Sequence, residues 1–403
     1  MKISNNKIFS KIINIVPAII ILTIVLKIFI FSDYISWQKQ YDQFSIPSNT
    51  YPGGDARNIQ LTAYCEVNYN DNFKDCYKLA KPIVEIYPEA NVPPNNYPKL
   101  WSYTYGLFDN FSEEFFMNFW RANAIALFIT LFLLALRTNH AFFAIAAFSP
   151  VTILTIERGN IDAITFFILY IPILLTTKAH KFNSLFILLA ASAKVFPIFA
   201  LPIFFLKIFQ NNFKVIIMGF IISSPLLVWS FKDIFVFSEY TSYGFKVAYG
   251  FLSLLNAPFF SDNHEIAYFV LSLYVLGIIF YINFEKKNKI YNDLIREISL
   301  LSKRDSFLFF TSILIFGLTF VFSISWAYRL IFLFPALFIL SNLLSKFSKI
   351  LLFIIILVFW SPVLGWNLQN LMCYILFFFI SPIYFRVFIL FKKFNKINLY
   401  FVK

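Results

Sequence analysis

A carboxylate framed by glycines is the first feature of the sequence that could do chemistry. Residues 51–60 read YPGGDARNIQ, so two glycines precede Asp55 and Arg57 follows it closely. Glycines let a backbone approach a bound molecule, and a nearby guanidinium favours an ionised carboxylate. Such a group can act as a general base toward a hydroxyl. The same letters are equally typical of an ordinary turn.

Three cations in distant parts of the chain form a second candidate group. Arg158 lies within the letters ERGNID, Lys194 within AKVFP and Arg329 within WAYR. Guanidinium groups match phosphate oxygens in pairs, and fixed cations stabilise charge that develops on a departing phosphate. We therefore expect these three side chains to converge on one phosphate.

Polar neighbours complete the candidate binding set. The set comprises Arg57, Glu157, Arg158, Asn160, Asp162, Lys194, Tyr328 and Arg329. In an empty site Glu157 is expected to relieve the repulsion between the cations. Tyr328 is also typical of the aromatic belt at a membrane surface.

Each charged member also has a purely structural explanation. Glu157 and Arg158 can form a local pair that caps the following helix, with Asp162 favourable in its first turn. Lys194 can extend its ammonium group toward water, and Arg329 can anchor a helix end. These alternatives stay open from the sequence alone.

No pattern in the sequence predicts a metal site or a cofactor. The three histidines are His140, His180 and His264. The first two fall in loops predicted to be cytoplasmic, and the third stands alone before a helix. No cluster with the spacing of metal ligands is visible.

The elements that position these residues belong in a lipid bilayer. The chain has 403 residues, of which 59% are hydrophobic and 14% charged, and it has 56 phenylalanines. Its mean hydropathy is +0.71. Apolar runs long enough to cross a bilayer recur along it, separated by short basic loops. The sequence therefore predicts an all-α polytopic membrane protein, and the net charge of +13 reports topology instead of nucleic-acid binding.

Three regions follow from the apolar pattern. Residues 1–31 are predicted to be an N-terminal transmembrane anchor, because no small-residue cleavage site follows the apolar run. Residues 32–116 form a long external loop that holds 11 of the 21 acidic residues and the candidate base. Residues 117–403 form a transmembrane domain of many helices.

Short basic loops set the predicted orientation. Those expected in the cytoplasm are 137–140, 178–181, 207–214, 285–305, 346–349 and the C-terminal tail. All the candidate site residues then fall on the external side. Between two of these loops lie only 23 residues, from Ser184 to Leu206, too few for two full passes. This stretch is predicted to be a hairpin of two short helices with Lys194 and Pro197 at its tip.

The order of these motifs resembles the GT-C superfamily of integral-membrane glycosyltransferases. The similarity rests on the acid of the first external loop, the RGN.D turn, an alanine-rich run before K.FP, and YRLIFLFPAL late in the chain. It is closest to the polyprenyl-phosphate-mannose-dependent mannosyltransferases and their uncharacterised bacterial relatives. The letters NYPKLWSY are similar to the YPPL stretch of that family, with Lys99 in place of a proline.

The resemblance implies a bundle of about 11–13 transmembrane helices in a bacterial inner membrane. It implies that Asp55 is the essential acid and that the donor is a hexose, expected to be mannose, on a polyprenyl phosphate. The acceptor would be a hydroxyl of a lipid or glycan at the external, periplasmic face. The reaction would invert the anomeric centre, and surrounding membrane lipids would be the other partners.

Two other functions and the cysteines remain open. A transporter or flippase of lipid-linked sugars would also need an external polar cup, but should show an inverted repeat and a matching inner cluster. A polysaccharide polymerase or ligase more often has its large loop late in the chain.

Cys65 and Cys76 are equally compatible with a disulfide and with free thiols, and Cys373 is predicted to be a buried free thiol.

Overall fold

The structure is a computed structural model of the whole chain. It describes residues 2–30, 59, 100–101, 113–138, 141–175, 183–205, 213–231, 248–251, 253, 264–285, 289–322 and 325–389. Asp55, Arg57, Cys65 and Cys76 lie outside the described residues.

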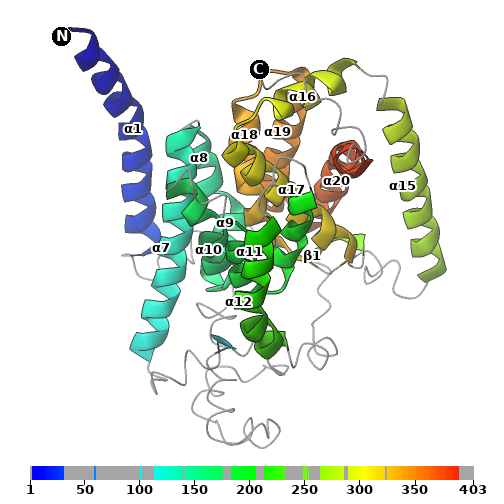
Figure 1. Ribbon diagram of the computed structural model, residues 1–403, viewed down its shortest axis with the longest axis horizontal. Helices are drawn as coiled ribbons and strands as arrows, with labels where there is room; N and C mark the ends of the chain where they lie inside the picture. The colour runs from blue at the N-terminus through cyan, green and yellow to red at the C-terminus, as the bar shows by residue number, and fades with distance from the viewer. Residues whose placement is uncertain are drawn as a thin grey trace, which may run out of the picture.

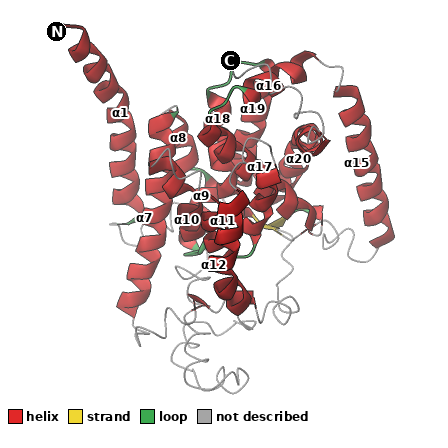
Figure 2. Cartoon of the chain, in the orientation of Figure 1, coloured by secondary structure: helices red, strands yellow, loops and turns green. Residues whose placement is uncertain are grey.

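The described residues are helical almost throughout, as Figure 2 shows. In chain order (Figure 1) the elements are α1 (Lys2–Phe29), α7 (Glu113–Arg137), α8 (Ala141–Ala147), α9 (Pro150–Glu157), α10 (Asp162–Leu175), α11 (Asn183–Ala193), η2 (Phe196–Phe205), α12 (Phe213–Phe231), β1 (Ala248–Tyr249), α15 (His264–Glu285), α16 (Lys289–Ser299), α17 (Lys303–Phe322), β2 (Ser325–Trp326), η5 (Ala327–Leu333), α18 (Phe334–Ser341), α19 (Lys346–Trp360), η6 (Ser361–Leu364) and α20 (Trp366–Ile389). The elements named η are 3-10 helices, and β1 and β2 form one short antiparallel pair. The prediction of an all-α chain is confirmed.

Five described helices are long and apolar enough to cross a bilayer, which makes the chain a polytopic membrane protein. They cover Met117–Arg137, Glu265–Phe284, Lys303–Phe322, Lys346–Leu364 and Asn367–Tyr384. A sixth pass arises if α9 and α10 count as one, although they are bent by 115°. Four further apolar helices are shorter, and they include Ile15–Phe29 of the predicted N-terminal anchor. The expected 11–13 passes refer to the whole chain, and within the described residues several apolar runs are divided into short pieces.

Apolar side chains face both inward and outward, as expected for helices in lipid. On α15, Phe269 and Phe280 are 64% and 74% exposed. The helix α16 is different, because it is amphipathic. Its apolar residues Tyr291 and Leu294 are fully buried, whereas Arg296 on the same helix is exposed.

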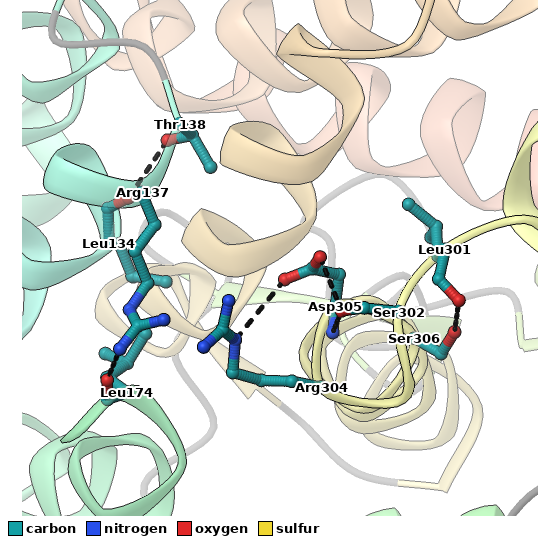
Figure 3. A network of polar contacts seen from close by, with 9 residues as sticks. All are labelled: Leu134, Arg137, Thr138, Leu174, Leu301, Ser302, Arg304, Asp305 and Ser306. Atoms are coloured by element: carbon teal, nitrogen blue, oxygen red, sulfur yellow. Dashed lines mark hydrogen bonds and ion pairs between the residues drawn. The ribbon is translucent and has the colours of Figure 1, made fainter. Parts of the chain in front are cut away.

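One end of the bundle gathers basic residues, and we call it the basic end, defined by Arg137, Arg304 and Lys346. Figure 3 shows Arg137 at the end of α7 donating a hydrogen bond to the carbonyl of Leu174 at the end of α10. In the same view Arg304 of α17 pairs with Asp305 at 3.6 Å.

The start of α19 belongs to the same end. The carboxylate of Glu297 on α16 accepts hydrogen bonds from the backbone N–H groups of Leu344 and Ser345, each at 2.9 Å. Ser345 is the N-cap of α19, and its side chain accepts from the N–H of Ser348. Glu297 therefore ties the predicted cytoplasmic loop 285–305 to the start of the loop 346–349.

The opposite end of α7 meets the turn between α9 and α10. The indole N–H of Trp120 donates to the carbonyl of Ile156 at 2.6 Å. Since Arg137 reaches Leu174 at the other end, α7 and α10 run side by side in the same direction. The turn between α9 and α10 thus lies away from the basic end.

The predicted hairpin around Lys194 is confirmed. The helix α11 ends at Ala193, and η2 begins at Phe196 after a two-residue bend. Pro197 lies in the first turn of η2 instead of in the bend itself. The hairpin carries Lys194 to the same end of the bundle as the turn between α9 and α10.

Candidate active site

The turn between α9 and α10 is built by a glycine and an asparagine. Gly159 has φ 58, a left-handed conformation that residues with a side chain adopt at a cost. Its N–H donates to the carbonyl of Ile156, and the N–H of Asn160 donates to that of Thr155. This pattern of two bonds is a Schellman motif, which ends α9 and reverses the chain.

The same asparagine starts the next helix. The Oδ1 atom of Asn160 accepts a hydrogen bond from the backbone N–H of Asp162 at 2.9 Å. Asp162 is the first residue of α10, where the helix dipole favours a negative charge. Both side chains are fully buried. The letters RGNID therefore encode a helix end, a reversal and a helix start that fix one carboxylate.

Lys194 meets this carboxylate from the tip of the hairpin. Its Nζ atom lies 2.7 Å from Oδ1 of Asp162 and donates to Oδ1 of Asn160 at 3.1 Å. The side chain of Lys194 is only 10% exposed. A buried charge is costly unless it is paired, so the contact with Asp162 explains why the ammonium group is tolerated at this depth.

Arg329 approaches the same carboxylate from the other side. Its Nε atom lies 3.9 Å from Oδ2 of Asp162, and its guanidinium lies over the ring of Phe196, 5.3 Å from the centroid. Arg329 belongs to η5, which directly follows the strand β2. We name Asn160, Asp162, Lys194 and Arg329 the charged cluster. Two cations share one carboxylate in it, so its net charge is +1.

Glu157 and Arg158 lie at the turn that carries Asp162. Glu157 is the last residue of α9 and is 1% exposed, and Arg158 is the C-cap of that helix. The carboxylate of Asp162 contacts both Lys194 and Arg329, so it relieves the repulsion between these two cations. The chain reversal at Gly159 turns the start of α10, and with it Asp162, toward the hairpin tip. The expected role of Glu157 stays a prediction.

A layer of aromatic rings lies one turn deeper than the charges. Phe166 follows Asp162 on α10, and Phe332 follows Arg329 on η5. The rings of Phe166 and Phe332 meet at 5.5 Å, and Phe196 meets Phe332 at 4.8 Å, both edge to face. We call these three rings the aromatic floor. On α10, which runs from Asp162 to the basic end, Phe166 lies on the side of the charges toward that end.

Two residues of the region 32–116 pack on the same turn. Ile59 is fully buried in a small apolar cluster with Trp101, Ile161 and Ala193. The indole N–H of Trp101 also donates to the carbonyl of Ala193 at 2.8 Å. Ala193 directly precedes Lys194, so this region contacts the hairpin tip next to its charged residue.

The structure thus brings together four of the predicted site residues, namely those of the charged cluster, and puts Glu157 and Arg158 on the same turn. Asp55 and Arg57 lie outside the described residues, and the side chain of Tyr328 is not described. Among the described residues no group of three metal-ligating side chains gathers. Cys373 is a buried free thiol, as predicted.

Sequence reasoning missed the aromatic floor, although a signal for it exists. Asp162, Lys194 and Arg329 are each followed by a phenylalanine two to four positions later. On short helices that all run away from the charges, this spacing places the rings one turn deeper. The contact of Trp101 with Ala193 has no comparable signal, because 92 positions separate the two residues.

The sequence matches no known protein-family model. A search of curated proteins likewise found none that matches it.

Proposed function

We propose that this chain is a membrane glycosyltransferase that moves a hexose, expected to be mannose, from a polyprenyl-phosphate donor to an acceptor hydroxyl. The reaction takes place at the external face of a bacterial inner membrane and inverts the anomeric centre. The acceptor is a lipid or a glycan. The charged cluster binds the phosphate of the donor, and Asp55 is the general base.

The observation that carries this proposal is a net-positive cluster recessed into the bundle. From Leu174 at the basic end to Asp162, α10 rises about 18 Å, less than the roughly 30 Å of a hydrocarbon core. The helix α7 extends about 10 Å past the turn between α9 and α10, measured from Trp120 back to the first residue of α7. A charged side chain at such depth costs free energy, so its presence there is by default a reason to expect a functional site. An anion held at a membrane interface, such as a lipid phosphate, fits a recessed site of charge +1.

A place for the lipid chain exists beside the bundle. A groove of about 380 Å³ is open between α15 and α20, and no polar atom lines it. Its lining residues are Val270, Leu271, Tyr274, Leu371, Tyr374, Ile375, Phe378 and Phe379. The hydroxyl of Tyr374 donates to the carbonyl of Gly250, next to β1. Since β1 pairs with β2, which leads into η5, the groove connects through one strand pair to the element that carries Arg329.

The general base is tethered to the site by chain length. Ile59 packs against Ile161 beside the charged cluster, and Asp55 precedes Ile59 by four residues. Four residues span at most about 14 Å, so chain length allows the proposed base to act on an acceptor bound at the cluster.

The chemistry requires one base and one stabilised leaving group. The acceptor oxygen bonds to the anomeric carbon as the bond from that carbon to the phosphate oxygen breaks. The acceptor proton passes to Asp55, and polyprenyl phosphate leaves. Lys194 and Arg329 would stabilise the charge on this phosphate, with Asp162 holding them in place before the donor binds.

Two alternatives have weaker support. A transporter of lipid-linked sugars needs a polar path across the bilayer, whereas packed aromatic rings follow the charged residues along the chain. A polymerase or ligase stays possible on chemistry alone, but its large external loop is expected late in the chain.

Binding and turnover of a synthetic polyprenyl-phosphate mannose by the purified protein in nanodiscs test the proposal. Asp55→Asn should bind the donor normally and lose transfer. Arg329→Ala should weaken donor binding by roughly 30-fold to several thousand-fold, the range for a removed charge contact. Arg329→Lys should also weaken donor binding, because a point charge does not replace a planar fork. The exposed Arg296→Lys is the matched control, since its partner Asp293 lies on the surface.

Two outcomes would contradict the proposal. If Arg329→Ala binds the donor as tightly as wild type does, the charged cluster is not the site that binds the phosphate. If wild type and Asp55→Asn move the lipid-linked sugar between leaflets equally well, and neither transfers the sugar to an acceptor, the result would favour the transporter.

A further inference from the structure

Three tryptophans share one unusual role in the described structure. Trp101 donates its indole N–H to the carbonyl of Ala193, Trp120 to Ile156 and Trp360 to Ile145. The donor–acceptor distances are 2.8, 2.6 and 3.3 Å. Each acceptor lies in the last turn of a short helix: α11, α9 and α8 respectively.

The last turn of a helix needs such partners. Its final carbonyls lack the N–H groups of a following helical turn, and inside a membrane there is little water to satisfy them. At the end of α9 the N–H of Gly159 also donates to the carbonyl of Ile156, so the indole of Trp120 is a second donor there. A buried carbonyl left unpaired costs free energy comparable to a lost hydrogen bond. The indole N–H is a donor carried by a large apolar ring, so it can satisfy a carbonyl without bringing in charge or water.

Two of the three capped helices end directly at charges. Ala193 is the residue before Lys194, and Ile156 is followed by Glu157 and Arg158. By contrast Ile145 precedes the uncharged stretch AAFSP. The first two caps therefore fix the backbone from which site residues project.

We propose that Trp101 and Trp120 are positioning residues for the charged turns. Trp101 fixes the position of the hairpin tip along the bundle and the direction in which the tip points. Through the tip it fixes the contact between Lys194 and Asp162. Trp120 sets the end of α9 and through it the turn at Arg158. Trp360 performs the same capping chemistry at a helix that carries no site residue. This inference concerns the geometry of the charged residues and holds whichever anion they bind.

Replacing one indole N–H while keeping an aromatic ring isolates this role. Trp101→Phe can retain the edge-to-face contact with Phe119, whose ring lies 5.9 Å away, but cannot donate to Ala193. Trp120→Phe and Trp360→Phe make the same change at the other two caps. The full-length proteins are prepared in nanodiscs, and thermal unfolding confirms that each is folded.

Chemical reactivity of the two cations is the readout. Initial rates of lysine acetylation by acetic anhydride and of arginine modification by phenylglyoxal are measured by mass spectrometry, with exposed Lys349 as internal reference. Trp101→Phe should raise the rate at Lys194 by roughly fivefold, the factor that corresponds to one lost hydrogen bond, and leave Arg158 unchanged. Trp120→Phe should do the reverse, and Trp360→Phe should change neither.

The pattern separates positioning from general loosening. Unchanged rates at both cations in all variants would overturn the inference, and so would a parallel rise at both cations in all three variants. If Trp101→Phe does not fold, Trp101→His keeps a ring N–H, and its Lys194 rate should stay near that of wild type. A fivefold rise at Lys194 in that folded variant would also count against the inference.

Discussion

Asp162 is the residue on which the charged cluster depends. Its carboxylate is fully buried and lies within 4 Å of cations from two other elements. Without a carboxylate at this point, Lys194 and Arg329 would repel each other in a medium that screens charge weakly. With it, they stay close enough to act on one anion.

This role predicts a large loss of stability from a small change. Asp162→Asn keeps the shape of the side chain but removes the carboxylate that the buried Lys194 and the half-buried Arg329 both contact, at a cost of about 3–5 kcal/mol. Thermal unfolding in detergent should show a clear drop in midpoint. The matched control is Asp293→Asn, which removes an exposed pair at 3.4 Å and should cost less than about 1 kcal/mol. Equal midpoints for the two variants would show that the cluster does not depend on Asp162.

Several members of the charged cluster were predictable because polar residues are rare in this chain. Asn160, Asp162, Lys194 and Arg329 all belong to the set predicted from the sequence, and the structure joins them. The position of Asp162 between two cations was not predictable. It depends on the left-handed conformation of Gly159, which turns the start of α10 toward the hairpin tip.

The charged side chains lie at interruptions between short helices and not within continuous transmembrane helices. Asp162 starts α10 after the reversal, Lys194 follows the end of α11, and Arg329 lies in the 3-10 helix before α18. An unbroken transmembrane helix satisfies its own backbone and offers few free groups. Interruptions let side chains and helix ends face one point, at the cost of carbonyls that other residues must satisfy.

The unbroken helices depend on close packing instead, which Gly317 of α17 illustrates. A Cβ atom at this position would collide with the phenol ring of Tyr384 on α20. Gly317→Ala should therefore lower the thermal midpoint, although alanine favours the helix by about 1 kcal/mol. Gly277→Ala on α15 is the control, because its new atom would meet only Phe378 at 3.8 Å and should leave the midpoint unchanged or higher. A stable Gly317→Ala protein would mean that α17 and α20 pack less tightly than described.

The hairpin was predictable from length, whereas the number of passes was not. Only 23 residues separate two basic loops, so geometry excluded two full spans there. Elsewhere the sequence shows apolar runs without revealing where they break. The division at Ser149 and Pro150, where α9 begins, depends on a local cap between Ser149 and Thr152.

For the molecule as a whole, the arrangement of charges defines two ends. Arg137, Arg304 and the start of α19 share the basic end, and the charged cluster lies away from it. If the basic end faces the cytoplasm, as the positive-inside rule indicates, the charged cluster opens to the external side.

Two exposed leucines at opposite ends of α19 test this orientation. Leu344 and Leu364 are 84% and 78% exposed, so a cysteine at either position should be open to reagents. In a chain whose Cys65 and Cys76 are replaced by serine, an impermeant maleimide added to intact cells should label Leu364→Cys. It should label Leu344→Cys only after the membrane is opened, and the buried Cys373 should stay unlabelled throughout. The reverse order of labelling would invert the topology and move the charged cluster to the cytoplasmic side.

The aromatic floor also bears on how a membrane keeps its stored energy. Many membranes store energy as a voltage and a proton gradient, and any continuous thread of water through a protein discharges both. A charged site recessed into the bilayer and open to water would thin the insulating layer beneath it. Hydrophobic constrictions exclude water, and the rings of Phe166, Phe196 and Phe332 pack edge to face beside the charges. If the charged cluster opens to water, we expect this packing to keep ionised groups in the membrane without a leak.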